Sequence, residues 1–162
     1  MDSLDLTTKI LVYSYDEASV STKKLVDEAK KAIQTSYSPY SGFKVGAAVL
    51  LSNGEIVKGS NQENAAYPSG LCAERVTLFA ANSGYPDMSV DAIAIAAFHD
   101  GGFTNAPCTP CGGCRQVMLE VENRYKNPIR VIMYGNDKIY EVESVKDLLP
   151  LSFGQEALGE RG

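Results

Sequence analysis

The sequence lacks the features by which several large classes of protein are recognised. It has 15 lysine and arginine residues against 20 acidic residues, a formal net charge of −5, and no basic cluster. Binding to DNA or RNA needs a basic surface, so we expect no nucleic-acid polymer among its partners. No apolar run is long enough to span a membrane, so we expect no membrane partner either.

A secretion signal is also missing, because residues 1–19 carry acidic residues and only a short apolar stretch. We therefore expect a cytoplasmic protein. Thiols stay reduced in that compartment, so the four cysteines indicate metal binding or catalysis before disulfides. Histidine is nearly absent: the single His99 follows an apolar run, and we interpret it as a structural or surface residue.

The length of 162 residues suits one compact domain. Apolar spacing predicts an amphipathic helix over residues 22–36, with Ser21 or Thr22 as its N-cap. A strand pair joined by an Asn-Gly turn follows, and strand and helix patterns then alternate. The expected strands cover residues 43–51, 56–63, 90–98, 128–135 and 138–143, and the later helices cover residues 72–82, 112–125 and 144–150.

This order predicts an α/β fold, a three-layer α-β-α sandwich around a mixed central sheet of about five strands. We assign residues 1–20 to an N-terminal extension of uncertain structure and residues 21–162 to a single catalytic domain.

The cysteines fall into one isolated residue and one cluster. Cys72 stands where a loop passes into a helical pattern, and the stretch "PCTPCGGCRQ" contains Cys108, Cys111 and Cys114. We expect Cys111 and Cys114 in the first turn of a helix, where free amide groups and a partial positive charge favour thiolates. Cys72, Cys111 and Cys114 can therefore converge on one zinc ion. Three ligands leave the fourth tetrahedral position open for water, as in catalytic zinc sites.

Glu74 follows Cys72 by two positions. Residues two apart on a regular helix point to different sides, so the pair faces one ion only if Cys72 lies at the very start of the helix. With that geometry, we interpret Glu74 as a proton shuttle beside the metal and not as a ligand.

Two alternatives use the remaining cysteine. A structural zinc site would take Cys108 as its fourth ligand. An iron–sulfur cluster would use all four cysteines, which the local C-x-x-C-x-x-C spacing favours. The surroundings of Cys72 and Cys108 are not ferredoxin-like, which counts against a cluster.

The motifs around these residues carry a resemblance to a known family. C-A-E at residues 72–74, with P-C-x-x-C at residues 110–114, is similar to the signature of zinc-dependent deaminases. Together with "SPYSGFKVGAAV", "NQENAAYPSGLCAER" and "LLPLSFG", it makes roughly residues 22–158 resemble the small homotetrameric cytidine deaminases. The resemblance implies a cytidine deaminase-like fold and the hydrolytic deamination of cytidine and 2′-deoxycytidine, with release of ammonia, in pyrimidine salvage.

The resemblance further implies a role for each residue of the metal centre. The ligands of one zinc ion per chain would be Cys72, Cys111 and Cys114, and Glu74 would be the catalytic carboxylate. Cys108 has no role in the family pattern.

For the nucleoside substrate, the resemblance implies that Asn61 and Glu63 hold the ribose hydroxyls and that the pyrimidine packs on Phe43. Phe153 would reach the site of a neighbouring subunit, in a homotetramer with shared active sites. An alternative keeps the zinc chemistry but changes the aminated heterocycle, for example to the nucleoside antibiotic blasticidin S. Asn61 and Glu63 count against it because they favour a free ribose.

Two arginines directly follow these residues in sequence. Arg75 follows Glu74, and Arg115 follows Cys114. We expect both to withdraw charge from the metal-binding sulfurs as outer partners.

Overall fold

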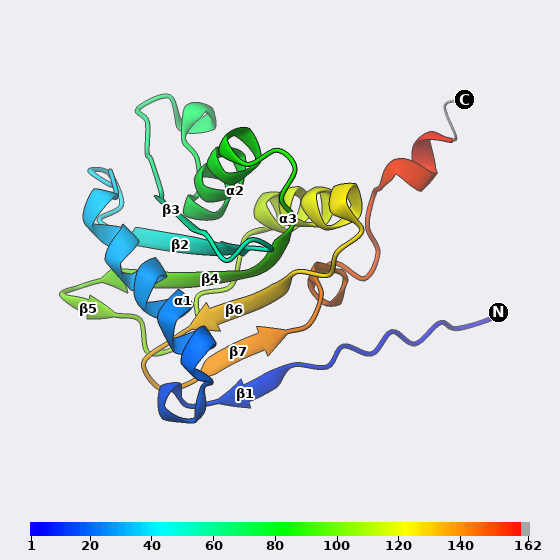
Figure 1. Cartoon of the computed structure of the whole chain (residues 1–162), viewed down its shortest axis with the longest axis horizontal. Coiled ribbons are helices and arrows are strands. Elements are labelled where there is room, and N and C mark those ends of the chain that lie inside the picture. Colours follow the sequence, from blue (N-terminus) through cyan, green and yellow to red (C-terminus); the bar gives the residue numbers. More distant parts are fainter. Residues whose placement is uncertain (160–162) are drawn as a thin grey trace.

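In the computed structural model of this chain, which describes residues 1–159, a seven-stranded mixed sheet lies between helices on its two faces (Figure 1). The strand order is β1-β7-β6-β4-β2-β3, with β5 paired to β4; β4 and β6 run parallel and every other pair is antiparallel. The strands are β1 Leu11–Tyr13, β2 Lys44–Leu51, β3 Ile56–Ser60, β4 Val90–His99, β5 Gly102–Phe103, β6 Arg130–Tyr134 and β7 Ile139–Val142.

Three α-helices cover the sheet: α1 Val20–Ala32, α2 Ala73–Gly84 and α3 Gly112–Tyr125. Short 3₁₀ helices lie at η1 Tyr15–Glu17, η2 Ile33–Thr35, η3 Tyr67–Ser69, η4 Val145–Leu148 and η5 Gln155–Leu158. Within residues 1–159, none of the helices has the length and apolar character that crossing a membrane requires.

Side chains of β4 point alternately to the two faces of the sheet, and the two sets differ in size. Ile93 and Ile95 are fully buried in the core shared with α2 and α3, whereas the alanines between and beside them face α1. Small residues let α1 approach the sheet closely: a Cβ atom at Gly46 would stand 2.1 Å from the carbonyl oxygen of Ala29. Larger side chains on the other face fix how α2 and α3 lie on the sheet.

The predicted α/β sandwich is confirmed, but the count of about five strands is wrong, because the sheet has seven. The two additional strands are β1, with three residues, and β5, with two. Neither is long enough to produce an alternating pattern in the sequence.

The N-terminal extension takes part in the fold. Strand β1 pairs with β7, and the Tyr13 hydroxyl donates to the carboxylate of Glu141, which also forms a 2.8 Å ion pair with Arg130. The Tyr15 hydroxyl donates to Asp27 of α1 at 2.8 Å. The boundary between residues 20 and 21 stays a prediction, but part of the extension belongs to the central sheet.

The first helix begins earlier than its sequence pattern indicated. Its N-cap is Ser19, whose hydroxyl oxygen accepts the Thr22 N–H at 3.1 Å, so the prediction of Ser21 or Thr22 as the cap is wrong. Several hydroxyl residues in succession offer equivalent capping groups, and the apolar spacing does not choose among them.

Candidate metal centre and substrate pocket

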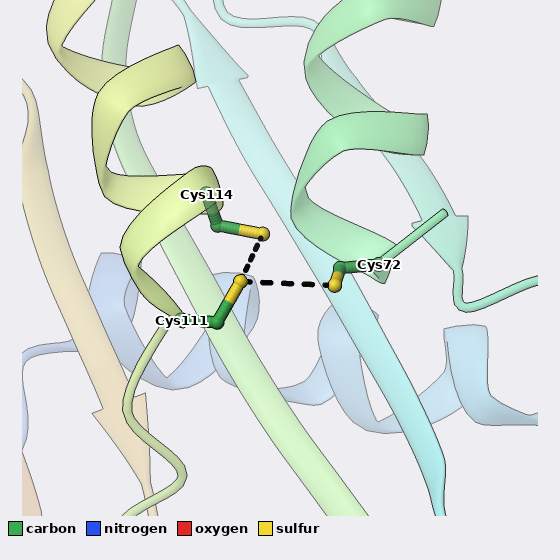
Figure 2. A group of neighbouring side chains, drawn as sticks. All are labelled: Cys72, Cys111 and Cys114. Atoms are coloured by element: carbon green, nitrogen blue, oxygen red, sulfur yellow. Dashed lines mark hydrogen bonds between the residues drawn. The ribbon is translucent and has the colours of Figure 1, made fainter. Parts of the chain in front are cut away.

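Three cysteine sulfurs meet between the starts of α2 and α3, and Figure 2 shows them pointing toward one another. Cys72 is the N-cap of α2, Cys111 is the N-cap of α3, and Cys114 lies in the first turn of α3. The Sγ–Sγ distances are 3.9 Å from Cys72 to Cys111 and 3.5 Å from Cys111 to Cys114.

This donor set fits a zinc ion. All three sulfurs lie within 4.8 Å of one another. Thiolates at ~2.3 Å from a tetrahedral zinc ion are ~3.8 Å apart, which is close to the spacing of these side chains. The three thiols therefore form a potential metal-binding site, as the sequence predicted.

The surroundings of the sulfurs favour a thiolate at Cys72. A hydrogen bond with Cys114 and the nearby guanidinium of Arg75, whose Nη2 is 3.7 Å from the Cys72 sulfur, lower the pKa of Cys72 to about 5. The same hydrogen bond, together with burial, raises the pKa of Cys114. Of these two thiols, Cys72 is therefore the one that deprotonates more readily.

The fourth cysteine stays outside the cluster. Cys108 packs against the core beneath α2 and α3, and burial raises the pKa of its thiol to about 11. Among the residues whose placement is described, its sulfur does not join the group of possible metal ligands. This arrangement counts against both a four-cysteine zinc site and an iron–sulfur cluster.

Glu74 is buried in the first turn of α2, with 5% of its surface exposed. Burial raises the pKa of its carboxyl group, and the charge of Cys72 raises it further. Its oxygens are not part of the ligand group formed by the three sulfurs. The start of α2 thus carries one thiol of the potential metal-binding site and one buried carboxyl group whose oxygens lie outside that group.

A cavity of about 530 Å³ opens beside Cys72, a size that suits a small molecule. Asn61 and Glu63 line it, and their contact with a substrate stays a prediction. Tyr40 and Tyr67 line it too, and their rings meet edge to face with centroids 6.2 Å apart. We did not single out these tyrosines from the sequence, although both stand inside the motifs "SPYSG" and "ENAAYPSG".

The two predicted phenylalanine contacts lie elsewhere. Phe43 packs against His99, with ring centroids 5.5 Å apart, and does not line the cavity. Phe153 is 60% exposed on the segment after η4, where its carbonyl accepts the Gln116 amide at 2.8 Å. His99 itself lies at the exposed end of β4. The roles of Phe43 and Phe153 stay predictions.

The two arginines differ in their contacts. Arg75 reaches the Cys72 sulfur, and its Nε is buried without a hydrogen-bond partner among the described residues. Arg115 donates instead to the carbonyls of Pro110 and Leu148, each at 2.9 Å. Arg75 is therefore placed to act on the Cys72 sulfur directly. Arg115 instead links the loop before Cys111 to Leu148 by hydrogen bonds.

Residues 19–127 match the family model of the cytidine and deoxycytidylate deaminase zinc-binding region. The chain is 41% identical over 139 residues to a cytidine deaminase of Halalkalibacterium halodurans, an alignment that covers 84% of this chain and 96% of that protein. It is 36% identical to a cytidine deaminase of Mycobacterium tuberculosis, over 80% of this chain and 87% of that one.

The crystal structure of cytidine deaminase from Burkholderia pseudomallei superposes with a TM-score of 0.70 at 38% identity, and covers 81% of this chain and 98% of that one. Sequence, fold and thiol cluster agree, and the chain belongs to the cytidine and deoxycytidylate deaminase family.

Proposed function

We propose that this protein deaminates cytidine and 2′-deoxycytidine by hydrolysis, giving the uridine forms and ammonia. The observation that carries the proposal is the three-thiol cluster with the buried Glu74 two residues from Cys72, beside a cavity sized for a nucleoside. The relatives named cytidine deaminase support the choice of substrate. A role in pyrimidine salvage and a cytoplasmic location complete the proposal.

The reaction needs one activated water and one proton carrier. Cys72, Cys111 and Cys114 would hold a zinc ion, which would supply the Lewis acidity that makes a water molecule reactive near neutral pH. Glu74 takes one proton from that water and passes it to N3 of the base while the oxygen bonds to C4. It then moves the second proton to the amine as the C4–N bond breaks, so ammonia leaves and a carbonyl remains.

The same zinc chemistry could act on another aminated heterocycle, so the substrate must be tested directly. Purified protein should release ammonia and form uridine from cytidine, and should act similarly on 2′-deoxycytidine. Blasticidin S should be a much poorer substrate, because Asn61 and Glu63 line the cavity where a ribose would lie. Turnover of blasticidin S with none of cytidine would contradict the proposed substrate.

Arg75 should support catalysis without binding the metal. We expect Arg75→Gln to keep one zinc per chain and to lower activity by about 10- to 100-fold, the usual cost of losing an outer partner of a metal ligand. The reason is its Nη2 contact with the Cys72 sulfur, which withdraws charge from an anionic cluster. Arg124→Gln on α3 is the control, because Arg124 lies over the ring of Tyr125 and not at the sulfurs. Unchanged activity of Arg75→Gln over the whole pH range would contradict this role.

The active unit is proposed to be a homotetramer with shared sites. Phe79 on the outer face of α2 is 47% exposed, and Phe153 on the C-terminal segment is 60% exposed. Exposed aromatic side chains of this size are typical of contacts between subunits. In the tetramer, Phe153 of one subunit closes the cavity of its neighbour and keeps water from the base.

Phe153→Ala should therefore weaken activity while zinc content stays at one per chain. When Phe153→Ala and Glu74→Ala chains are refolded together, some activity should return, since mixed oligomers contain sites with Glu74 from one chain and Phe153 from another. Chains that carry both changes are the control, and they should not restore activity to Phe153→Ala chains. Verified mixed oligomers without rescue, or a fully active monomer, would contradict shared sites.

A further inference from the structure

Glu63 is itself held in place by the loop that precedes β2. One carboxylate oxygen, Oε2, accepts the backbone N–H groups of Tyr40 at 2.9 Å and Ser41 at 3.3 Å. The other oxygen, Oε1, accepts the hydroxyl proton of Ser41. Three donors from two adjacent residues thus fix both oxygens of a side chain that lines the cavity.

A second contact determines the direction of the Ser41 hydroxyl. Its oxygen accepts the backbone N–H of Phe43 at 3.0 Å. A serine hydroxyl has a single proton, so with its oxygen engaged by Phe43 that proton is directed to Glu63. The donors from Ser41 and Tyr40 also lower the pKa of Glu63, which keeps it an acceptor.

One oxygen of the Glu63 carboxylate can then accept a further hydrogen bond. Two backbone donors occupy Oε2, whereas among residues 1–159 Oε1 receives only the Ser41 hydroxyl and has a second lone-pair direction left. A hydroxyl group of a ligand in the cavity can donate to that remaining direction.

Asn61 is tied to the same loop. Its Nδ2 donates to the carbonyl of Phe43 at 2.9 Å, and its Oδ1 accepts from the hydroxyl of Ser36 at 2.6 Å and from the Val45 N–H at 2.8 Å. Both backbone groups of Phe43 are therefore held, one by Ser41 and the other by Asn61. The loop and the two polar residues of the cavity form one hydrogen-bonded unit.

We infer that Ser41 is a positioning residue of the ribose site, whose hydroxyl aims the free acceptor of Glu63 at a sugar hydroxyl of the nucleoside. This inference rests on the proposed function, in which Glu63 holds the ribose. Ser41 acts only through Glu63 and the loop, and it takes no part in the chemical step at the base.

The test compares two nucleosides in the Ser41→Ala variant. KM for cytidine should rise about tenfold, the size of one hydrogen bond to a charged group, while kcat changes by less than about twofold. With 2′,3′-dideoxycytidine, which lacks both hydroxyls, the loss relative to wild type should be less than about twofold in kcat/KM, since no sugar hydroxyl meets Glu63. Where turnover of that nucleoside is too slow, its inhibition constant against cytidine gives the same comparison.

Two further variants separate positioning from general damage to the loop. Ser41→Thr keeps the hydroxyl and should restore KM for cytidine. Ser38→Ala removes a hydroxyl of the same loop that does not contact Glu63, and it should behave as wild type.

An unchanged KM for cytidine in Ser41→Ala would overturn the inference. So would an equal loss with both nucleosides, because that result means a distorted loop. Failure of the wild-type protein to deaminate cytidine would instead refute the proposed function, so the two failures are distinguishable.

Discussion

Glu74→Ala should retain the fold and one zinc per chain, yet its kcat for cytidine should fall by at least about 100-fold, the contribution of general acid–base catalysis. The carboxyl group lies buried at the start of α2 and outside the group of metal-binding atoms. Its removal should therefore leave the thiol cluster intact. In the proposed mechanism, the lost side chain is the group that carries protons from water to N3 and to the leaving amine.

Glu74→Gln is the matched control for packing. It preserves the shape of a side chain that is 5% exposed, but it cannot accept and return a proton. Both variants should show this loss of kcat, with zinc content measured by atomic absorption and folding by thermal unfolding. A Glu74→Ala protein with near wild-type kcat would remove the proton-shuttle role, and a zinc-free one would make Glu74 part of the metal site.

Cys111→Ser and Cys108→Ser should have opposite outcomes, although the two cysteines are only three residues apart. The Cys111 sulfur lies between those of Cys72 and Cys114, at 3.9 and 3.5 Å (Figure 2). Its loss should empty the site and abolish deamination. Among the described residues, the Cys108 sulfur lies outside the group of possible metal ligands, so its loss should leave the site intact.

Cys108→Ser should accordingly keep both zinc and activity near the wild-type level. Zinc per chain and ammonia release from cytidine are measured on both proteins. If Cys108→Ser loses its zinc, the ligand assignment is wrong; if Cys111→Ser keeps zinc and activity, the cluster is not the metal site.

Local patterns in the sequence predicted most of the fold. The helix over residues 112–125 is found at the same bounds, because its apolar spacing and the glycines at its start leave few alternatives. The helix cap at Ser19 and the strands β1 and β5 were missed. A strand as short as Leu11–Tyr13 forms because it pairs with the edge of β7, which lies far along the chain. Such pairing cannot be predicted from the local sequence.

The thiol cluster could be predicted because each of its two parts depends on a local feature of the sequence, the start of a helix. Cys72 and Cys111 each cap a helix, and helix starts are readable from sequence. The contacts of Phe43 and Arg115 were harder to predict from the sequence. Phe43 meets His99 at the end of another strand, and Arg115 turns to the carbonyls of Pro110 and Leu148. Such contacts depend on tertiary packing that motif spacing does not encode.

The most direct test of a zinc-dependent cytidine deaminase is a zinc titration of metal-free protein during which ammonia release from cytidine is followed. The three-thiol site predicts that activity is negligible without metal, rises in proportion to added zinc, and reaches its plateau at one zinc per chain. Full activity in the metal-free protein would contradict zinc dependence, and a zinc-saturated protein that releases no ammonia from cytidine would contradict the deaminase activity.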